Sequence, residues 1–381
     1  MINYYGRPWV GMSKYIELWS TFIPDETSSL VNEVLESGWL NTGEKERLLR
    51  EELKRKFNLP YCVATNSGTA ALRASYAALG IGPGDEVIST PYTFIATNTA
   101  ILEQGAIPVF ADIQYDTLNI DPDKIAEKIT DRTKAIVCVH YGGNPCDMDR
   151  IRQIGKDFSL PVVEDSAHAL ASKYKGDYVG SKGDVVCFSL QAIKVITSAD
   201  GGVVSTNNEE LYNRIQQLSW YGIDRSKRDP KSIDPLPDSI DNLGFKSNLN
   251  DIAAAMGLAG LRNVGDALES RRRIGEAYRD QLSDCSRVRL LNYSKDVTPN
   301  YQIFPVHVED RQRFAQHMES RNIQVRLNNR RNDRYSIFGG LKELPSTERA
   351  DKDTIIIPVH AGMNSEDCDR VIDAVRGYDK L

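Results

Sequence analysis

Short apolar runs of strand length alternate with helical patterns between residues 61 and 206, and this alternation constrains the fold more than any other feature. We predict strands at Tyr61–Thr65, Glu86–Thr90, Ile107–Asp112, Thr133–His140, Pro161–Asp165, Asp184–Leu190 and Gly202–Thr206. We predict helices between several of them, at Thr69–Leu79, Thr97–Gln104, Pro122–Lys128 and Met148–Phe158. This order indicates an α/β fold with a large, mostly parallel, doubly wound sheet. In such a sheet, ligands bind beyond the carboxyl ends of the strands.

The pattern changes near Asn250. Residues 251–262 are rich in Ala, Gly and Met and predict a tightly packed helix. Further helices are predicted at Leu268–Leu282, Asp310–Arg321 and Ser365–Tyr378, and strands at Val288–Leu291, Asn300–His307 and Ile355–Pro358. We therefore expect an N-terminal segment and a large domain over residues 1–249, and a smaller α+β domain over residues 250–381. Tyr221–Asn242 lacks periodicity and is predicted to be a long loop. A functional loop and a surface insertion are equally good interpretations of this segment.

The composition excludes several classes of protein. The 381 residues carry a net charge of −6, which argues against nucleic-acid binding. We expect the clusters Arg271–Arg273 and Arg330–Arg331 on solvated faces, with contact to a phosphorylated ligand as a minor alternative. The six cysteines form no CxxC pair, which favours reduced thiols and no metal site. Because Met1–Pro8 lacks the apolar region of a signal peptide and no stretch is long enough to span a membrane, we expect a cytoplasmic protein.

A carboxylate and a lysine stand at the ends of separate predicted strands. Asp165 closes one apolar run, and Lys194 follows another. The next charged residue after Lys194 is Asp200, so the lysine stands in an uncharged stretch. Asp165 could simply cap a helix, and most lysines are surface charges. A lysine in an apolar pocket, however, loses its proton more easily, as Schiff-base chemistry requires. The pair suits pyridoxal phosphate, because the amine can bond to its aldehyde and the carboxylate can pair with its pyridine nitrogen.

Small hydroxyl residues surround a glycine where the first predicted strand meets a helix. Gly68 lies between Ser67 and Thr69, so backbone N–H groups could approach a phosphate at the helix N-terminus. An ordinary helix cap made by Ser67 or Thr69 is the alternative. Ser189, five residues before Lys194, could bind the same phosphate or be a buried hydroxyl satisfied by the backbone.

Aromatic and imidazole side chains follow other strands. Tyr92 and Phe94 come after Glu86–Thr90, and either ring could stack on a flat cofactor or lie in the core. The spacing does not choose between them. His168 follows Asp165 and could be a core histidine or a contact to the phenolic oxygen of the cofactor.

These motifs, taken in order, resemble those of one enzyme family. They are Ser37–Gly43, Ser67–Thr69, Pro91–Thr97, Glu164–His168, Ser189 with Lys194, and Gly244–Asp251. From Ile23 to the C-terminus the chain is similar to the DegT/DnrJ/EryC1/StrS family of pyridoxal-phosphate-dependent sugar aminotransferases. The resemblance implies fold type I and a homodimer with active sites shared between subunits.

The resemblance also implies a role for each motif residue. Lys194 would form the Schiff base, Asp165 would pair with the pyridine nitrogen, Gly68, Thr69 and Ser189 would hold the phosphate, Phe94 would stack on the ring, and His168 would lie near its phenolic oxygen. Asn248 or Lys246 would reach the phosphate bound by the neighbouring subunit. Freed Lys194 would move the proton between the donor carbon and the cofactor.

The implied reaction carries an amino group from L-glutamate to a keto group of a nucleotide-linked deoxysugar. A sister group of dehydratases has histidine in place of the lysine, so Lys194 favours amino transfer. The segment Asn328–Tyr335 departs from the His-Tyr pair of many members, so the sugar pocket is expected to differ. Two alternatives stay open, a Schiff-base lyase without cofactor and a sensor that binds the cofactor without transamination.

Overall fold

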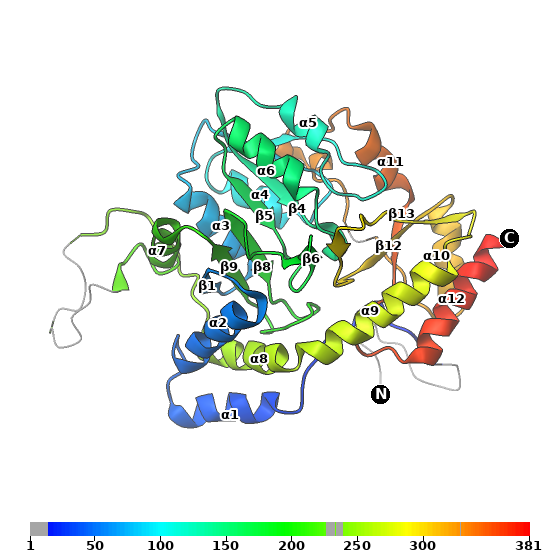
Figure 1. Ribbon diagram of the computed structural model, residues 1–381, viewed down its shortest axis with the longest axis horizontal. Helices are drawn as coiled ribbons and strands as arrows, with labels where there is room; N and C mark the ends of the chain where they lie inside the picture. Colours follow the sequence, from blue (N-terminus) through cyan, green and yellow to red (C-terminus); the bar gives the residue numbers. More distant parts are fainter. Residues whose placement is uncertain (1–13, 226–232, 234–238, 328) are drawn as a thin grey trace.

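The computed structural model describes residues 14–225, 233, 239–327 and 329–381 and has an α/β fold built on a seven-stranded sheet (Figure 1). The strand order is β1-β9-β8-β5-β4-β2-β3. The strands are β1 (Tyr61–Thr65), β2 (Glu86–Ser89), β3 (Ile107–Phe110), β4 (Thr133–Val139), β5 (Val162–Asp165), β8 (Val185–Ser189) and β9 (Gly202–Thr206). Neighbours from β8 to β3 pair in parallel, and β9 is antiparallel to both β1 and β8. The predicted mostly parallel sheet is confirmed.

Helices cover both faces of this sheet. They are α2 (Glu44–Phe57), α3 (Gly68–Ala78), α4 (Ala96–Leu102), α5 (Pro122–Ala126), α6 (Met148–Asp157), α7 (Glu209–Leu218) and α8 (Asp251–Arg262). Side chains of α3, α4 and α7 pack against one face, and those of α2, α5, α6 and α8 pack against the other. This double cover explains why every residue of β5 and β8 is buried.

Four of the α-helices in the described part of the chain have no counterpart in the sequence-based prediction. They are α1 (Thr27–Ser37), α2, α7 and α11 (Pro345–Asp353). Charged residues dominate α2, but Leu49, Leu53 and Phe57 recur at four-residue spacing and are almost completely buried. That spacing places them on one helical face, which packs on the sheet.

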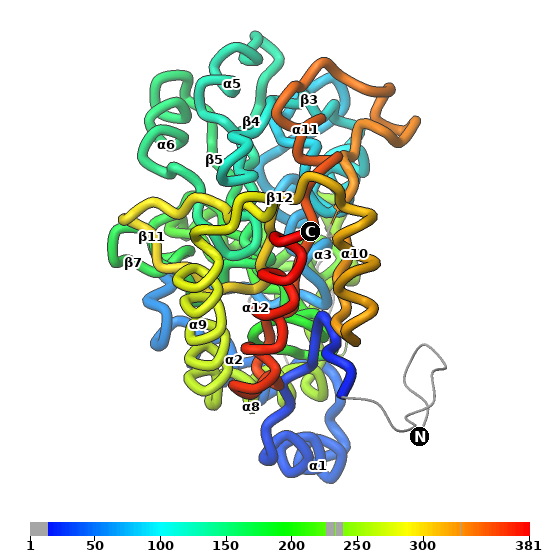
Figure 2. Tube along the Cα trace, turned by 90° about the vertical axis from the view of Figure 1, so that its right-hand side faces the viewer, coloured from blue at the N-terminus to red at the C-terminus, as the bar shows by residue number. Residues whose placement is uncertain are grey.

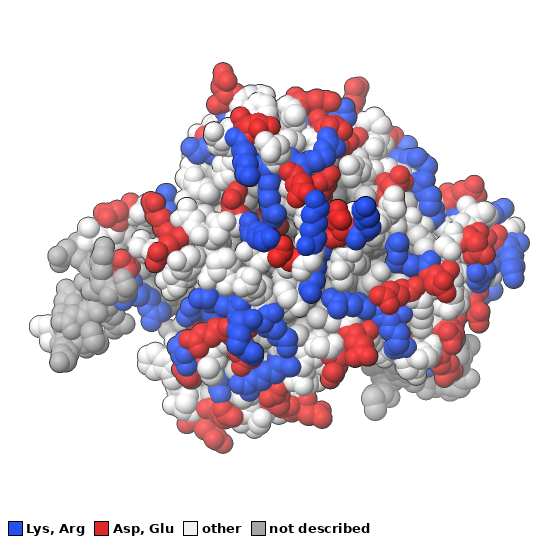
Figure 3. Space-filling model, viewed as in Figure 1, with Lys and Arg blue, Asp and Glu red and all other residues white. Residues whose placement is uncertain are grey.

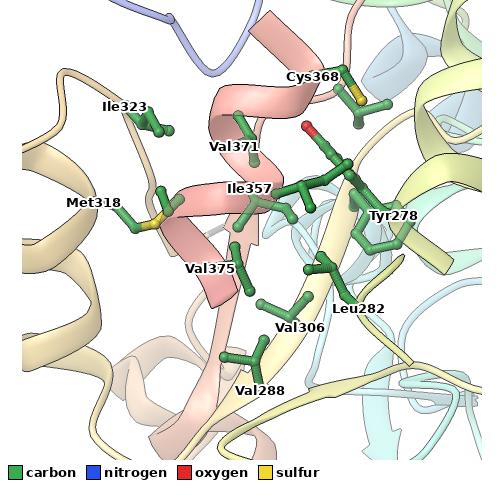
Figure 4. Close-up of a cluster of buried hydrophobic side chains, with 14 of the residues drawn as sticks. Tyr278, Leu282, Val288, Val306, Met318, Ile323, Ile357, Cys368, Val371 and Val375 are labelled. Carbon is green, nitrogen blue, oxygen red and sulfur yellow. The ribbon is translucent and has the colours of Figure 1, made fainter. Parts of the chain in front are cut away.

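A second, antiparallel sheet lies in the C-terminal part of the chain. It has the order β10-β12-β13, from Val288–Leu290, Phe304–Val308 and Thr354–Ile357. The helices α9 (Val264–Gln281), α10 (Arg311–Glu319) and α12 (Ser365–Asp379) lie side by side in Figure 2. Their apolar side chains and those of the sheet form one core, part of which Figure 4 shows. The predicted C-terminal strands and helices are thus present, with ends shifted by a few residues.

The chain passes from one core to the other along α9. Val264 and Ala267 pack with the large sheet, and Ile274 and Tyr278 pack with the second sheet. The domain boundary at residue 250 stays a proposal. Smaller elements complete the structure: β6 (Lys173–Tyr174), β7 (Asp177–Tyr178) and β11 (Val297–Thr298) form a third sheet, and α11 (Pro345–Asp353) precedes β13.

The two ends of the described chain meet at the second sheet. Ile16 pairs with Ile323, and the backbone N–H of Leu18 donates to Oε1 of Gln324 at 3.0 Å. Ile16 itself lies in the core of the second sheet, close to α10 and α12. Residues 14–18 are therefore part of the C-terminal fold.

The surface carries both signs of charge. Acidic and basic side chains are interspersed over the face shown in Figure 3. None of the helices within the described ranges is both long enough and apolar enough to cross a bilayer. The predicted loop Tyr221–Asn242 falls largely outside the described residues.

Candidate active site

A cavity of about 440 Å³ opens beyond the carboxyl ends of the central strands. Its lining includes Gly68, Thr69, Phe94, Asp165, His168, Ser189 and Lys194. These residues come from segments far apart in the sequence, and the sheet brings them together where a doubly wound fold places its ligands. Of the predicted site residues, only Lys246 and Asn248 do not line this cavity.

Asp165 is the last residue of β5 and is buried. Its Oδ2 accepts a hydrogen bond from Thr97 Oγ1 at 2.7 Å, and its Oδ1 accepts one from the backbone N–H of Ala167 at 3.1 Å. Burial raises the pKa of Asp165, and these hydrogen bonds partly offset the effect. Each carboxylate oxygen keeps a free lone pair, so Asp165 can still accept a hydrogen bond from a protonated ring nitrogen.

Lys194 lies in the loop between β8 and β9. Its backbone N–H donates to the carbonyl oxygen of Gln191 at 2.9 Å, which places Lys194 at the end of a tight turn. Burial lowers the pKa of Lys194 to about 8, with Asp165 opposing the shift and Arg271 adding to it. At neutral pH a larger fraction of this amine is therefore unprotonated than of an ordinary lysine amine. Only the unprotonated amine is a nucleophile.

The N-terminus of α3 and the end of β8 form a polar recess. Ser67 caps the helix by accepting from the backbone N–H of Ala70 at 3.0 Å, so the capping interpretation holds for Ser67. Ser67, Thr69 and Ser189 all line the cavity. A Cβ atom on Gly68 would lie 3.0 Å from that of Ser189, which is tighter than ordinary van der Waals contact, so glycine avoids crowding between the two segments. Unpaired N–H groups of the first helical turn beside hydroxyls suit a phosphate.

The structure separates the two candidate aromatic residues. Tyr92 is 2% exposed and packs with its ring centroid 5.4 Å from that of Tyr141, so it belongs to the core. Phe94 is 63% exposed and lies at the cavity. Phe94 is thus the ring that a planar ligand in the cavity can reach.

His168 presents an imidazole nitrogen without a protein partner. Its Nδ1 is buried and has no hydrogen bond within the part of the chain that the structure describes. Burial, with the nearby charges of Lys194 and Arg271, lowers the pKa of His168 well below its ordinary value. A neutral ring with an unused nitrogen suits a hydrogen bond to a ligand oxygen. Together with the recess at Gly68, this nitrogen fits pyridoxal phosphate.

Lys246 and Asn248 occupy a different place. Lys246 Nζ lies 2.5 Å from Oδ1 of Asn248 and 3.9 Å from the ring centroid of Trp220. The side-chain amide of Asn248 donates to Thr42 Oγ1 at 2.7 Å. Within one chain, neither residue reaches the Lys194 cavity, so a contact with a neighbouring subunit stays a proposal.

Some lining residues were not predicted. Trp19 and Asn329 line the cavity from segments near opposite ends of the chain, and the buried Nε1 of Trp19 has no hydrogen bond among the described residues. Thr97 belongs to the Pro91–Thr97 motif, but the sequence does not show that its hydroxyl holds Asp165. Trp19 stands in no motif of the sequence, whereas Asn329 belongs to the segment Asn328–Tyr335, where the sugar pocket is expected to differ.

The prediction of solvated arginine clusters is wrong for Arg271 and Arg331. Arg271 is 2% exposed, and its Nη1 donates to the carbonyl oxygens of Tyr301, Gln302 and Val359. Arg331 is 3% exposed and pairs with Asp333 at 2.6 Å. In both cases backbone or carboxylate oxygens replace the water that the guanidinium loses.

Three potential metal ligands also come together. One ligand atom each from Cys138, His140 and Cys146 lies within 4.8 Å of the others, although the sequence shows no metal-binding spacing. His140 Nδ1 accepts from the backbone N–H of Cys146 at 3.1 Å, and Nε2 lies 2.9 Å from Oε2 of Glu164. Both ring nitrogens are thus already bonded, so the cluster is a closed polar network.

Comparison with known proteins shows the family to which the chain belongs. The model of the DegT/DnrJ/EryC1/StrS aminotransferase family matches residues 22–376. The spore coat polysaccharide biosynthesis protein SpsC of Bacillus subtilis is 35% identical over 362 residues, which cover 91% of this chain and 92% of SpsC.

Two solved structures extend the agreement. The sugar aminotransferase CalS13 of Micromonospora echinospora superposes with a TM-score of 0.89 at 30% identity, covering 95% of this chain and 99% of CalS13. Spr1654 of Streptococcus pneumoniae, solved in its PLP form, gives a TM-score of 0.89 at 29% identity over 96% of this chain and 99% of Spr1654. The chain therefore belongs to the DegT/DnrJ/EryC1/StrS aminotransferase family and is a fold-type-I aminotransferase whose cofactor is pyridoxal phosphate.

Proposed function

We propose that this aminotransferase moves an amino group from L-glutamate to a keto group of a nucleotide-linked deoxysugar. The observation that carries the proposal is the convergence of Lys194, Asp165 and the Gly68 recess on one cavity. The similarity to SpsC and CalS13, whose names refer to polysaccharide synthesis and to sugars, supports a sugar as the amino acceptor.

The proposed roles of the residues follow from their geometry. Bound pyridoxal phosphate supplies an electron-accepting ring that stabilises negative charge on the substrate carbon. Asp165 would accept a hydrogen bond from the protonated ring nitrogen, while Thr97 holds one of the two carboxylate oxygens in place. The Lys194 amine, with its lowered pKa, takes the proton from the donor carbon and returns it as general acid.

The remaining residues bind and orient. Gly68, Thr69 and Ser189 would hold the phosphate at the start of α3, and Phe94 would cover the ring. His168 would bond the phenolic oxygen through a ring nitrogen that has no partner among the described residues.

We propose that the enzyme works as a homodimer. Lys246 or Asn248 would reach the phosphate held by the partner, because neither reaches the cavity of its own chain. Trp39, Leu40 and Leu243 are 61%, 47% and 90% exposed, and a partner surface that covered them would remove this apolar area from water. All six cysteines are free thiols, which supports the reducing cytoplasm as the place of action.

A pair of half-reactions tests the proposed substrates. The aldehyde form of the enzyme is mixed with glutamate, glutamine, aspartate or alanine, and loss of its absorbance is followed. The amine form is then mixed with nucleotide-linked 3-keto and 4-keto sugars, and return of the aldehyde absorbance is followed.

We expect glutamate to react fastest in the first step and one keto-sugar to react in the second. A return of absorbance with simple 2-keto acids but with none of the sugars would overturn the proposal. A sensor that only binds the cofactor would show no change in either step, and a cofactor-free lyase would be colourless.

A further inference from the structure

The loop that carries Lys194 has no regular secondary structure to hold it in place. Lys194 lies between β8 and β9, where the chain makes turns and bends. The side-chain amide of Gln302 bonds the backbone on both sides of this lysine. Its Oε1 accepts from the N–H of Val195 at 3.1 Å, and its Nε2 donates to the carbonyl oxygen of Ile193 at 2.9 Å.

Gln302 is itself held firmly. It is 2% exposed and stands just before β12 of the second sheet. Its backbone N–H donates to Oδ1 of Asn300 at 2.9 Å, and its carbonyl oxygen accepts from Arg271 Nη1 at 3.0 Å. The side-chain amide of Asn300 donates in turn to the carbonyl oxygen of Leu170 at 2.8 Å. Because these bonds fix its backbone, Gln302 can restrain the loop at little further entropic cost.

We propose that Gln302 is a positioning residue that holds the Lys194 loop in the orientation that directs the amine into the cavity. Gln302 does not line the cavity, so it would act only through the backbone of the loop. The position of the Lys194 amine would then also depend on the second sheet, because Gln302 stands just before β12. The inference rests on the proposed role of Lys194, which a Lys194→Ala variant tests separately.

Losing this restraint should have a chemical consequence. Without Gln302, the partly buried C=O of Ile193 and the buried N–H of Val195 lose their partners, and the loop must shift to find others. A displacement of about 1 Å at a reacting group costs on the order of a hundredfold in rate.

The charge of the lysine offers a second readout. The groups that act on the Lys194 amine are Asp165 on β5, Arg271 on α9, and His168 after β5. Burial dominates the lowered pKa of Lys194, so a loop that lets the amine reach water should raise that pKa.

The experiment compares Gln302→Leu with Asn119→Leu. Asn119 is a matched control, because its buried amide also bonds the backbone at two points, the N–H of Tyr141 and the carbonyl oxygen of Asn144. It does not line the cavity. The measurements are kcat and KM, the thermal unfolding midpoint, and the pH dependence of Lys194 labelling by trinitrobenzenesulfonate in cofactor-free protein, read by peptide mass spectrometry.

For Gln302→Leu we expect kcat to fall by about a hundredfold, with a smaller change in KM. The labelling pKa of Lys194 should rise from about 8 in the unchanged protein towards about 10, the value of an exposed lysine. Asn119→Leu should lower the unfolding midpoint to a similar extent while leaving both readouts as they were.

An unchanged labelling pKa together with kcat within about twofold of the parent would overturn the inference. If the leucine variant does not fold, Gln302→Glu decides, because it keeps an acceptor for Val195 but sets a carboxylate oxygen against the Ile193 carbonyl. Activity retained by Lys194→Ala would instead defeat the proposed function. An inactive Lys194→Ala beside an active Gln302→Leu would defeat only the role of Gln302.

Discussion

Glu164 and Asp165 are neighbours on β5, but the regions around their carboxylates differ in almost every respect. Glu164 points to the face of the sheet that α6 covers, where His140, just after β4, and Arg152 on α6 each lie 2.9 Å from one of its oxygens. Asp165 faces the opposite side of the sheet, where Thr97 and one backbone N–H are its hydrogen-bond donors. Successive strand residues point to opposite faces, so one strand serves both a closed network and an open cavity.

The difference separates a structural carboxylate from one suited to chemistry. Burial alone would raise the pKa of Glu164, but the hydrogen bonds and charges of His140 and Arg152 lower it overall. No comparable set of partners surrounds Asp165 among the described residues, and burial raises its pKa. A buried carboxylate that has no cationic side chain hydrogen-bonded to it can bind a positively charged group of a ligand.

The largest expected effect is at the lysine of the open region. Lys194→Ala should lower kcat by at least about a thousandfold, since it removes both the bonding amine and the proton carrier. The visible absorbance of the lysine-bound cofactor should disappear. Lys182→Ala, which changes an exposed lysine, is the control. Full activity in Lys194→Ala would contradict the assignment.

The comparison becomes sharper when Asp165 is removed. Asp165→Ala should lower kcat by about a hundredfold even when the cofactor remains bound, because the ring nitrogen loses its charged partner. The unfolding free energy of the cofactor-free protein should change by only about 1 kcal/mol, because the lost hydrogen bonds are offset by removal of a buried charge. Denaturant unfolding and steady-state kinetics measure the two effects.

Removing Glu164 should have the opposite outcome. Glu164→Ala leaves His140 and Arg152 without their acceptor, which should lower the unfolding free energy by about 3 kcal/mol. The folded variant should keep kcat within about tenfold of the parent, because Glu164 does not line the cavity. A loss of kcat well beyond about tenfold in a variant whose unfolding free energy is unchanged would contradict the distinction between the two regions.

The smallest effect expected is a shift along the pH scale. Cofactor-free protein should bond added pyridoxal phosphate faster as the pH rises, and the rate should level off above about 8, where Lys194 has lost its proton. An ordinary lysine would show a rate that still rises to about pH 10. Stopped-flow absorbance over this range distinguishes the two curves.

Much of the large sheet was predictable because its strands are continuous apolar runs. The predicted Tyr61–Thr65 and Gly202–Thr206 match β1 and β9 residue for residue. The pair Asp165 and Lys194 was also predictable, because carboxyl ends of neighbouring strands must meet at one edge. The residue types there then indicate the chemistry.

Features that depend on packing could not be predicted in this way. The neighbouring Tyr92 and Phe94 have similar side chains, and only the turn after β2 decides which one is buried. Arg271 stands in a run of three arginines, but α9 turns it towards carbonyl oxygens of the second sheet. Helix α2 was not predicted because its charged residues outnumber the apolar residues on the face that packs against the sheet.

The pairing of Ile16 with Ile323 has a consequence for how the protein is made. Leu18 is synthesised 306 residues before its partner Gln324. A contact of such long sequence separation forms late in folding. Because Trp19 adjoins this segment and lines the cavity, the cavity wall is completed only after Ile323 and Gln324 have been made. Nascent chains that stop before these residues would therefore lack a complete cofactor site.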